Sequence, residues 1–491
     1  MFTAPQHRLK LLLALILLGI LGDALLRIFP WGLGAFTWFA LIVTLHIAYR
    51  RGIDAPMPPG LRWALGAALL FALFIAWRDA PGLKALNIFV VLTSIVIAAA
   101  LAAKRNLRQA WIRSYLAAAL ECIASTLTAP FKATPQFSES IRSREESTNI
   151  PFLSILRGIL IALPLLLGFG AFFFSADATF EALINKTFDF DFYDIAKHTL
   201  IACICAWFST AVIGLCLNGP STPIESTKPF FPTFLGAIEI NVVLGLINLL
   251  FLSFVIIQFQ YFFGAHERVI NETALTYADY ARRGFFELAA VAALALILLL
   301  TCARLIDEAG RGAKRLFAAL GCTLIALVLV ILASSLHRMS IYIDVYGLTR
   351  LRLYTAAFSL WLGAAYLWLV LTFIRDRPRE FALGFLLSAY AAAFLLQAIN
   401  PDAVITRTNI QRFHDGKSFD TEYALSLSAD AVPEVLNALP TLPPYLQQQM
   451  RPAFEKKWLN NAQPTRDLRT WSWARHAAYS ALQSSDATES Q

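Results

Sequence analysis

Charged residues are scarce in this chain of 491 residues: Asp, Glu, Lys and Arg together make up 15% of it, whereas 58% is hydrophobic. A soluble protein is about 25% charged, so this composition excludes a soluble nucleic-acid-binding protein and a disordered chain. Cysteine is also rare, with six residues in apolar or amphipathic stretches, where thiols behave as small hydrophobic groups. A secreted scaffold held together by disulfides is therefore excluded as well.

The common catalytic signatures are missing too. His266-Glu267 has no second histidine four residues after the first, which a zinc-protease helix needs, and no G-x-S-x-G turn occurs. The segment 310–314 (GRGAK) lacks the Walker spacing of a phosphate-binding loop, and we interpret it as a basic turn between two spans. The sequence predicts no catalytic residue and implies no cofactor.

What the chain does contain is a series of apolar runs near 20 residues long, the length that crosses a hydrocarbon layer of about 30 Å. They predict an all-α fold, a polytopic transmembrane helix bundle of about 11 spans with a small helical C-terminal segment outside the membrane. The predicted spans are 11–29, 33–49, 61–77, 83–103, 152–175, 198–218, 234–263, 285–306, 316–336, 353–374 and 380–398.

The distribution of Lys and Arg predicts the orientation. With the N-terminus in the cytoplasm, the inner segments carry 21 of the 41 basic residues and the outer loops carry 11, which agrees with the positive-inside tendency. Because the number of spans is odd, the C-terminal tail is then expected on the extracytoplasmic, or periplasmic, side.

The stretch 107–131 decides this topology, because its apolar residues recur at helical spacing and a crossing there would invert all later segments. Glu121 lies at its centre, where a charge in lipid would cost several kcal/mol. We therefore expect an amphipathic helix on the cytoplasmic surface. The predicted organisation is a four-span segment (1–104), this helix with a polar linker (105–151), a seven-span core (152–398) and an extramembrane helical tail (399–491).

Two groups of polar residues were considered as sites. Glu239, Asn241 and Asn248 lie in the seventh predicted span, and polar groups inside a membrane serve either a transport path or hydrogen bonding between helices. Asp189, Asp191 and Asp194 lie in the sequence FDFDFYD. Paired carboxylates can hold a hard cation, but an acidic, solvated loop explains them better, so no metal site is predicted.

Three segments carry a resemblance to a known family: YFFGAHERVINETALTYADYARRGFFEL (261–288), YIDVYGLTRLRLYT (342–355) and INPDAVITRTNIQRFHDGKSFDTEYALSLSADAVPEVL (399–436). In this order they resemble the DUF4173 group of bacterial multi-pass membrane proteins, over roughly residues 152–436. Because that name denotes a domain of unknown function, the resemblance implies a bacterial inner-membrane protein and no particular chemistry.

In the predicted topology these three segments bring arginines and tyrosines to the outer side, against the positive-inside tendency. Arginine forks bind phosphate or carboxylate groups, which suggests a site for an anionic headgroup or substrate. In the alternative, which we favour, the arginines pair with Asp344, Glu287 and helix ends, and dock the tail onto the spans. The candidate residues are Tyr280, Arg282, Arg283, Asp344, Tyr346, Arg350, Arg352, Arg407 and Arg412.

From these patterns we expect an integral protein of the bacterial inner membrane with a non-enzymatic structural or regulatory role in the cell envelope. The alternatives are a transporter or channel for a small or lipidic anion, and an envelope-modifying membrane enzyme. The expected partners are membrane lipids and, through the tail, other envelope proteins. Nucleic acid is not expected to bind.

Overall fold

The computed structural model describes residues 5–104, 107–112, 114–127, 192–219, 236–264, 285–306, 310–460 and 467–489. All regular structure in these residues is helical, without a strand. Among them, nine helices are long and apolar enough to cross a membrane. The chain is therefore a membrane-embedded, all-α polytopic helix bundle, as the apolar runs predicted.

The nine helices coincide with nine of the eleven predicted spans. Predicted span 152–175 lies outside the described residues. Predicted span 11–29 corresponds to helix α1 (Pro5–Leu26), whose apolar stretch Leu13–Leu26 is shorter than a full span. In each helix the residues not buried inside the protein include large aliphatic side chains, which suits a lipid surrounding.

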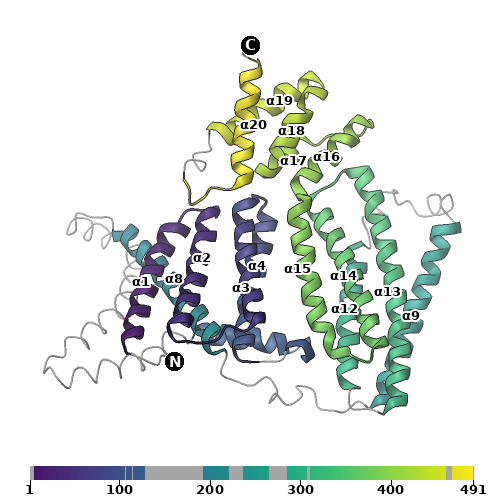
Figure 1. Cartoon of the computed structure of the whole chain (residues 1–491). Coiled ribbons are helices and arrows are strands. Elements are labelled where there is room, and N and C mark those ends of the chain that lie inside the picture. The colour runs from purple at the N-terminus through teal and green to yellow at the C-terminus, as the bar shows by residue number, and fades with distance from the viewer. Residues whose placement is uncertain are drawn as a thin grey trace, which may run out of the picture. The chain divides into compact units, whose positions relative to one another are not determined.

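The chain forms two compact units, and the first contains the N-terminal helices together with residues 460–479 (Figure 1). Helix α1 packs on α8 and α2, α3 packs on α2 and α4, and α4 also contacts α8. Trp38 of α2 donates a hydrogen bond from Nε1 to the carbonyl of Leu18, at 3.2 Å. The remaining helices of this unit are α2 (Leu33–Gly52), α3 (Pro59–Trp77), α4 (Pro81–Ala102) and α8 (Phe192–Asn218).

Near the C-terminus, the chain returns to the first unit and binds the beginning of α2. The amides of Leu33 and Gly34 donate to the carbonyls of Trp471 and Arg469, at 2.8 and 3.0 Å. Gly32 allows this approach, because a Cβ atom there would lie 2.1 Å from the Trp471 carbonyl oxygen. Helix α20 (Trp473–Glu489) begins directly after this contact.

The second unit contains five long helices around a buried apolar core that includes Leu299, Leu324, Tyr366, Leu369 and Phe381. Helix α13 packs on α9, α12 and α14, and α15 packs on α14. The five helices are α9 (Ala237–Gly264), α12 (Phe285–Leu305), α13 (Arg311–Tyr346), α14 (Arg350–Ile374) and α15 (Phe381–Ile399).

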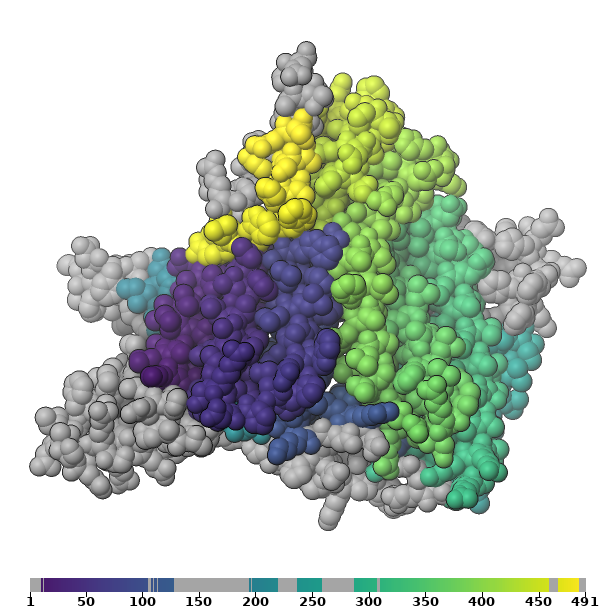
Figure 2. Space-filling model, viewed as in Figure 1, coloured from purple at the N-terminus to yellow at the C-terminus, as the bar shows by residue number. Residues whose placement is uncertain are grey.

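Helix α13 has 36 residues and is thus about 54 Å long at 1.5 Å per residue, well beyond a hydrocarbon layer of about 30 Å. It runs to Tyr346, ten residues past the predicted span, and its last turns reach the level of the helices that follow α15. Figures 1 and 2 show these tail helices stacked on one end of the spans of the second unit. They are α16 (Pro401–His414), α17 (Thr421–Ser426), α18 (Val432–Ala438) and α19 (Pro444–Glu455).

Two turns bound α16, one at residues 400–402 and one at residues 414–416. Asn400 has a φ of 56° and reverses the chain between α15 and α16, and Pro401 occupies the first turn of α16, where its missing N–H costs nothing. Gly416, with a φ of 80°, follows the end of α16. The chain therefore folds back over the end of α14 immediately after leaving α15.

Candidate functional site

A buried carboxylate lies where the tail helices meet the spans of the second unit. Arg350, the first residue of α14, donates from Nε to Oδ1 of Asp402 at 2.8 Å and from Nη2 to Oδ2 at 2.5 Å. Ser428 donates to the same Oδ2 from its backbone amide at 2.9 Å and from its hydroxyl at 2.6 Å. Asp402 is fully buried, so it lies in an environment where an unpaired charge would be costly.

The surroundings of Asp402 keep it ionised. Burial by itself would raise the pKa of Asp402, but the hydrogen bonds from Arg350 and Ser428 outweigh it, so the pKa lies below its ordinary value of 3.8. The position of Asp402 in the first turn of α16 also favours a negative charge, because the N-terminal end of a helix is electropositive.

Helix α16 also holds the connection between α13 and α14 through a second set of contacts. Arg412 donates from Nε and Nη2 to the carbonyl of Asp344, at 3.0 and 2.6 Å, and from Nη2 to that of Val345 at 2.9 Å. These are final carbonyls of α13, which have no partner within their own helix. Asn409 accepts from the amide of Leu348 at 2.7 Å and donates to its carbonyl at 2.9 Å.

Arg352 and the neighbouring tyrosines form the rim of this junction. The guanidinium of Arg352 lies 4.0 Å from the ring centre of Tyr342 and 5.9 Å from that of Tyr346, a cation–π arrangement. It also donates to the carbonyl of Gly347. The Tyr346 side chain is half exposed, and the backbone amide of Arg350 donates to the hydroxyl of Tyr423 at 2.7 Å.

Two further ion pairs lie on the surface of the same region. Arg407 of α16 contacts Glu434 of α18 at 2.5 Å, and Lys417 contacts Asp344 at 3.8 Å, with all four side chains partly exposed. Exposed pairs of this kind contribute little to stability, about 0 to 1 kcal/mol. Removing one partner of these exposed pairs should therefore cost less than removing a partner of the buried Asp402.

Six of the nine candidate binding residues thus meet at one place, the junction of α13, α14 and α16, and each of the four arginines among them contacts protein groups. Tyr280, Arg282 and Arg283 lie outside the described residues. The sequence analysis did not single out Asp402 or Ser428. The signal for Asp402 was an acidic residue in Asn-Pro-Asp directly after a span, opposite an arginine-rich segment.

We call Arg350, Asp402, Ser428, Asn409 and Arg412 the docking network. Its members come from α14, from α16 and from the loop before α18, which are more than 50 residues apart along the chain at their widest. The network has the chemistry of a structural joint, because Arg350 and Ser428 bind Asp402, while Asn409 and Arg412 bind the backbone between α13 and α14.

The polar residues of the seventh predicted span fall into two kinds. Asn248 donates to the carbonyl of Leu244 in its own helix at 2.9 Å and to that of Leu320 in α13 at 3.0 Å, and Asn241 donates to Ala313 at 3.5 Å. Both asparagines are buried and connect α9 to α13. Glu239 is exposed in the first turn of α9.

The acidic candidates for a metal site are only partly described. Asp194 is exposed in the first turn of α8, and Asp189 and Asp191 lie outside the described residues. Within the described part of the chain, no three His, Cys, Asp or Glu side chains are grouped closely enough to hold a metal ion.

A family model for a domain of unknown function, DUF4153, matches residues 65–438. The match covers 374 of the 491 residues. The chain belongs to the DUF4153 family. The expectation of a family of unknown function is confirmed, but the family is DUF4153 and not DUF4173. Neither the curated proteins nor the solved structures contain a match.

The DUF4153 region includes every member of the docking network and ends at the last residue of α18. It excludes α19 and the segment 467–489. The junction of spans and tail is therefore part of the family domain, and the contact of residues 469–471 with α2 involves segments on both sides of it.

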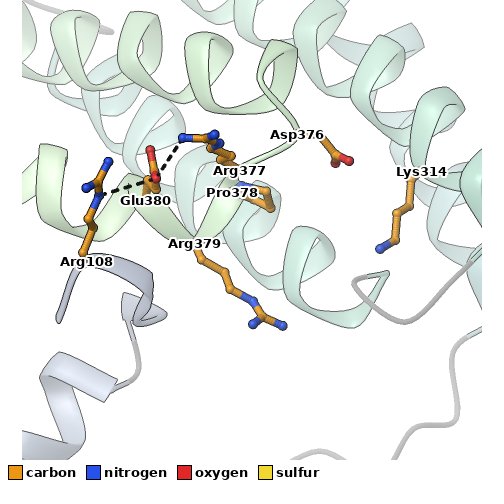
Figure 3. A pocket seen from close by; sticks show the side chains of 7 residues that line it. All are labelled: Arg108, Lys314, Asp376, Arg377, Pro378, Arg379 and Glu380. Atoms are coloured by element: carbon orange, nitrogen blue, oxygen red, sulfur yellow. Dashed lines mark hydrogen bonds and ion pairs between the residues drawn. The ribbon is translucent and has the colours of Figure 1, made fainter. Parts of the chain in front are cut away.

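A polar pocket that the sequence analysis did not predict lies at the turn between α14 and α15 in this DUF4153 chain. Its volume is about 620 Å³, and four basic and two acidic side chains line it. Figure 3 shows Arg108 and Arg377 both directed at Glu380, while Arg379 points away from it. The distances to Glu380 Oε1 are 3.7 and 3.5 Å, and both arginines are largely exposed, as expected of a solvated, basic turn.

Proposed function

We propose that this chain is a non-enzymatic structural or regulatory component of the bacterial cell envelope, embedded in the inner membrane, with its tail helices fixed to its spans by the docking network. The observation that carries this proposal is the fully buried Asp402. Arg350 neutralises its charge, and Ser428 donates hydrogen bonds to it. Such a joint serves to hold α16 to α18 in one position above α13 to α15. The tail helices then offer other envelope proteins a rigid contact surface.

The pairing of the arginines supports an orientation with the N-terminus in the cytoplasm and the tail on the periplasmic side. At the tail end of the second unit, Arg350 and Arg412 are bound by protein groups. At the opposite end, Arg375, Arg377 and Arg379 are exposed at the α14–α15 turn. The positive-inside tendency concerns basic residues in loops, so the exposed group is the one expected in the cytoplasm.

The asparagines of α9 favour a structural role over a transport path. Asn248 uses its side-chain amide to join α9 to the backbone of α13, which is the usual task of an amide between membrane helices. Its neighbours in the second unit form a continuous apolar core. A transport path through this part of the bundle would need polar groups directed at water instead.

The test compares two strains, in each of which the chromosomal gene for this protein encodes a tagged protein with one substitution. Asp402→Asn is expected to release the tail helices, seen as faster protease cleavage within 401–459 in membranes opened to the periplasmic side, and to reproduce the envelope phenotype of a deletion strain. The Asn248→Leu strain is expected to behave as the wild type, because Leu preserves the apolar packing between α9 and α13.

Glu434→Gln is the matched control for Asp402→Asn, because it removes a carboxylate from an exposed pair in the same layer. The proposal fails if Asp402→Asn releases the tail while the strain behaves as wild type. It also fails if Asn248→Leu abolishes function in a protein whose amount and protease pattern are unchanged, since that result is expected of a transporter.

A further inference from the structure

A groove of about 610 Å³ lies between α2 and α3 of the first unit, at the end joined by residues 53–58. Aliphatic side chains from both helices line its length, and three arginines lie at its mouth. The described residues that line it include no acidic side chain. Its aliphatic part includes Val43, Ile47, Leu65 and Leu69, and its arginines are Arg50, Arg51 and Arg62.

The three guanidinium groups differ in how they are held. Arg50 is buried, with 7% of its surface exposed, and donates to the carbonyls of Cys216 at 3.1 Å and Pro56 at 2.5 Å, while its Nε has no partner. Within the part of the chain that the structure describes, Arg62 donates from Nε alone, to the carbonyl of Met57 at 3.1 Å. The side chain of Arg51 is exposed and makes no hydrogen bond or ion pair with the described residues.

Several arginine N–H groups at this mouth are therefore available to an anion. Guanidinium forks match the oxygens of phosphate in number and geometry. The buried Arg50 gives the mouth a fixed positive charge, and the two exposed arginines can close on a ligand without breaking an ion pair. Since no carboxylate lines the groove, nothing in the lining competes with the anion.

The arginine end of the groove is expected at the depth of the lipid headgroups. Helices α2 and α3 are both candidate membrane spans, and the arginines occupy their joined ends. Trp63, beside Arg62, is 81% exposed, as is typical of an aromatic residue at the membrane–water interface. A Cβ atom built on Gly66 meets nothing within 4 Å, so the groove has open space one helical turn deeper than the arginines.

We propose that this groove binds one anionic glycerophospholipid, with its phosphate at Arg51 and Arg62 beside the fixed charge of Arg50, and one acyl chain along Val43, Ile47, Leu65 and Leu69. A basic pocket between membrane helices is a known form of headgroup recognition. The aliphatic part of the groove decides for a lipid over free phosphate, because a soluble anion gains nothing from it.

The experiment measures how much phosphatidylglycerol stays bound to the full-length protein, purified in mild detergent, by native mass spectrometry during titration with dioleoyl phosphatidylglycerol. The double variant Arg51→Gln/Arg62→Gln is expected to weaken binding by at least tenfold, since one basic residue near a charged lipid surface is worth about fivefold. Arg375→Gln, an exposed arginine at the end of another span, is the matched control and should leave binding unchanged.

Gly66→Leu tests the acyl-chain part, because it fills the open space and leaves all three arginines in the chain. We expect it to weaken phosphatidylglycerol binding while the melting temperature stays at or above that of the wild type, since Leu favours a helix more than Gly does. Gly66→Ala, which adds one carbon, is its control and should bind nearly as the wild type.

Three outcomes would overturn the proposal. One is equal retention of phosphatidylglycerol and phosphatidylcholine by the wild type. Another is unchanged retention in the double arginine variant. The third is displacement of the lipid by inorganic phosphate at millimolar concentration together with normal binding in Gly66→Leu, which would identify a soluble-anion site.

Discussion

Asp402 and Asp79 are buried carboxylates, and each is neutralised by cations from other parts of the chain. Asp402 meets Arg350 in the second unit. In the first unit, Asp79 follows α3 and lies 2.8 Å from Lys84 and 2.9 Å from Arg475. A buried ion pair stabilises a fold little more than apolar residues of similar volume would, but removing one partner leaves an uncompensated buried charge. These carboxylates are therefore sensitive points of the fold.

The lowered pKa of Asp402 predicts how the tail responds to acid. Because its folded-state pKa lies below the ordinary value of 3.8, its contribution to stability is complete above that pH and is lost as the pH falls further, through the folded-state pKa. Pepsin cleavage within the tail helices should therefore accelerate below about pH 3.8. Asp402→Asn should show fast cleavage at every pH tested, whereas Glu434→Gln should follow the wild type. A wild-type rate that stays constant down to pH 2 would contradict the prediction.

Asp79→Asn is expected to destabilise the first unit by about 3–5 kcal/mol, because Lys84 and Arg475 would both remain buried without their anion. Differential scanning fluorimetry in detergent should show a lowered unfolding midpoint. Asp54→Asn is the control: Asp54 is exposed, its φ of 49° suits asparagine, and its midpoint should not move. Equal midpoints for both variants would exclude the proposed role of Asp79.

At the level of elements, the short helix Ser114–Leu127 has two different faces. Leu116, Leu120, Ile123 and Leu127 recur at helical spacing and are 57–68% exposed, while Ala118 and Cys122 are buried. Cys122 packs in a small cluster with Ala99 of α4 and Leu215 of α8. The exposed apolar stripe suits a helix that rests in the headgroup region while its other side contacts the spans.

A spin label at Leu120 tests this position. In reconstituted vesicles, a Leu120→Cys label should be more accessible to oxygen than to a water-soluble nickel chelate, because oxygen concentrates in hydrocarbon. A Ser418→Cys label, on an exposed tail residue, should show the opposite preference. The lipid contact of the stripe would be refuted by a nickel accessibility at Leu120 as high as at Ser418.

For the molecule as a whole, the proposed orientation places the tail and the α14–α15 turn on opposite sides of the membrane. In a variant without its six native cysteines, Ser418→Cys should react with a membrane-impermeant maleimide added from outside. Arg375→Cys should react only after the membrane is opened. Both positions are exposed, so a failure to react reports sidedness and not burial. The reverse pattern would invert the topology.

Apolar runs of span length predict a membrane helix bundle without any tertiary information, because such runs have few alternatives in lipid. They also place nine spans correctly, since hydropathy depends on neighbouring residues. The expected pairing of arginines with helix ends is found for Arg412, which donates to the carbonyl oxygens at the end of α13. The expected carboxylate differs, because Asp402 and not Asp344 binds Arg350.

The pairing of Asp402 with Arg350 and the groove between α2 and α3 follow from the tertiary fold and not from local sequence. The reason is physical: hydropathy follows from a few consecutive residues, but the ionic partner of an arginine depends on which of several nearby carboxylates a turn brings within 3 Å. Asp402 reaches Arg350 because Asn400 turns the chain back over α14. A groove likewise depends on which side chains on two facing helices are small. The position of Gly66 in the sequence does not indicate that it lines a groove with residues of α2.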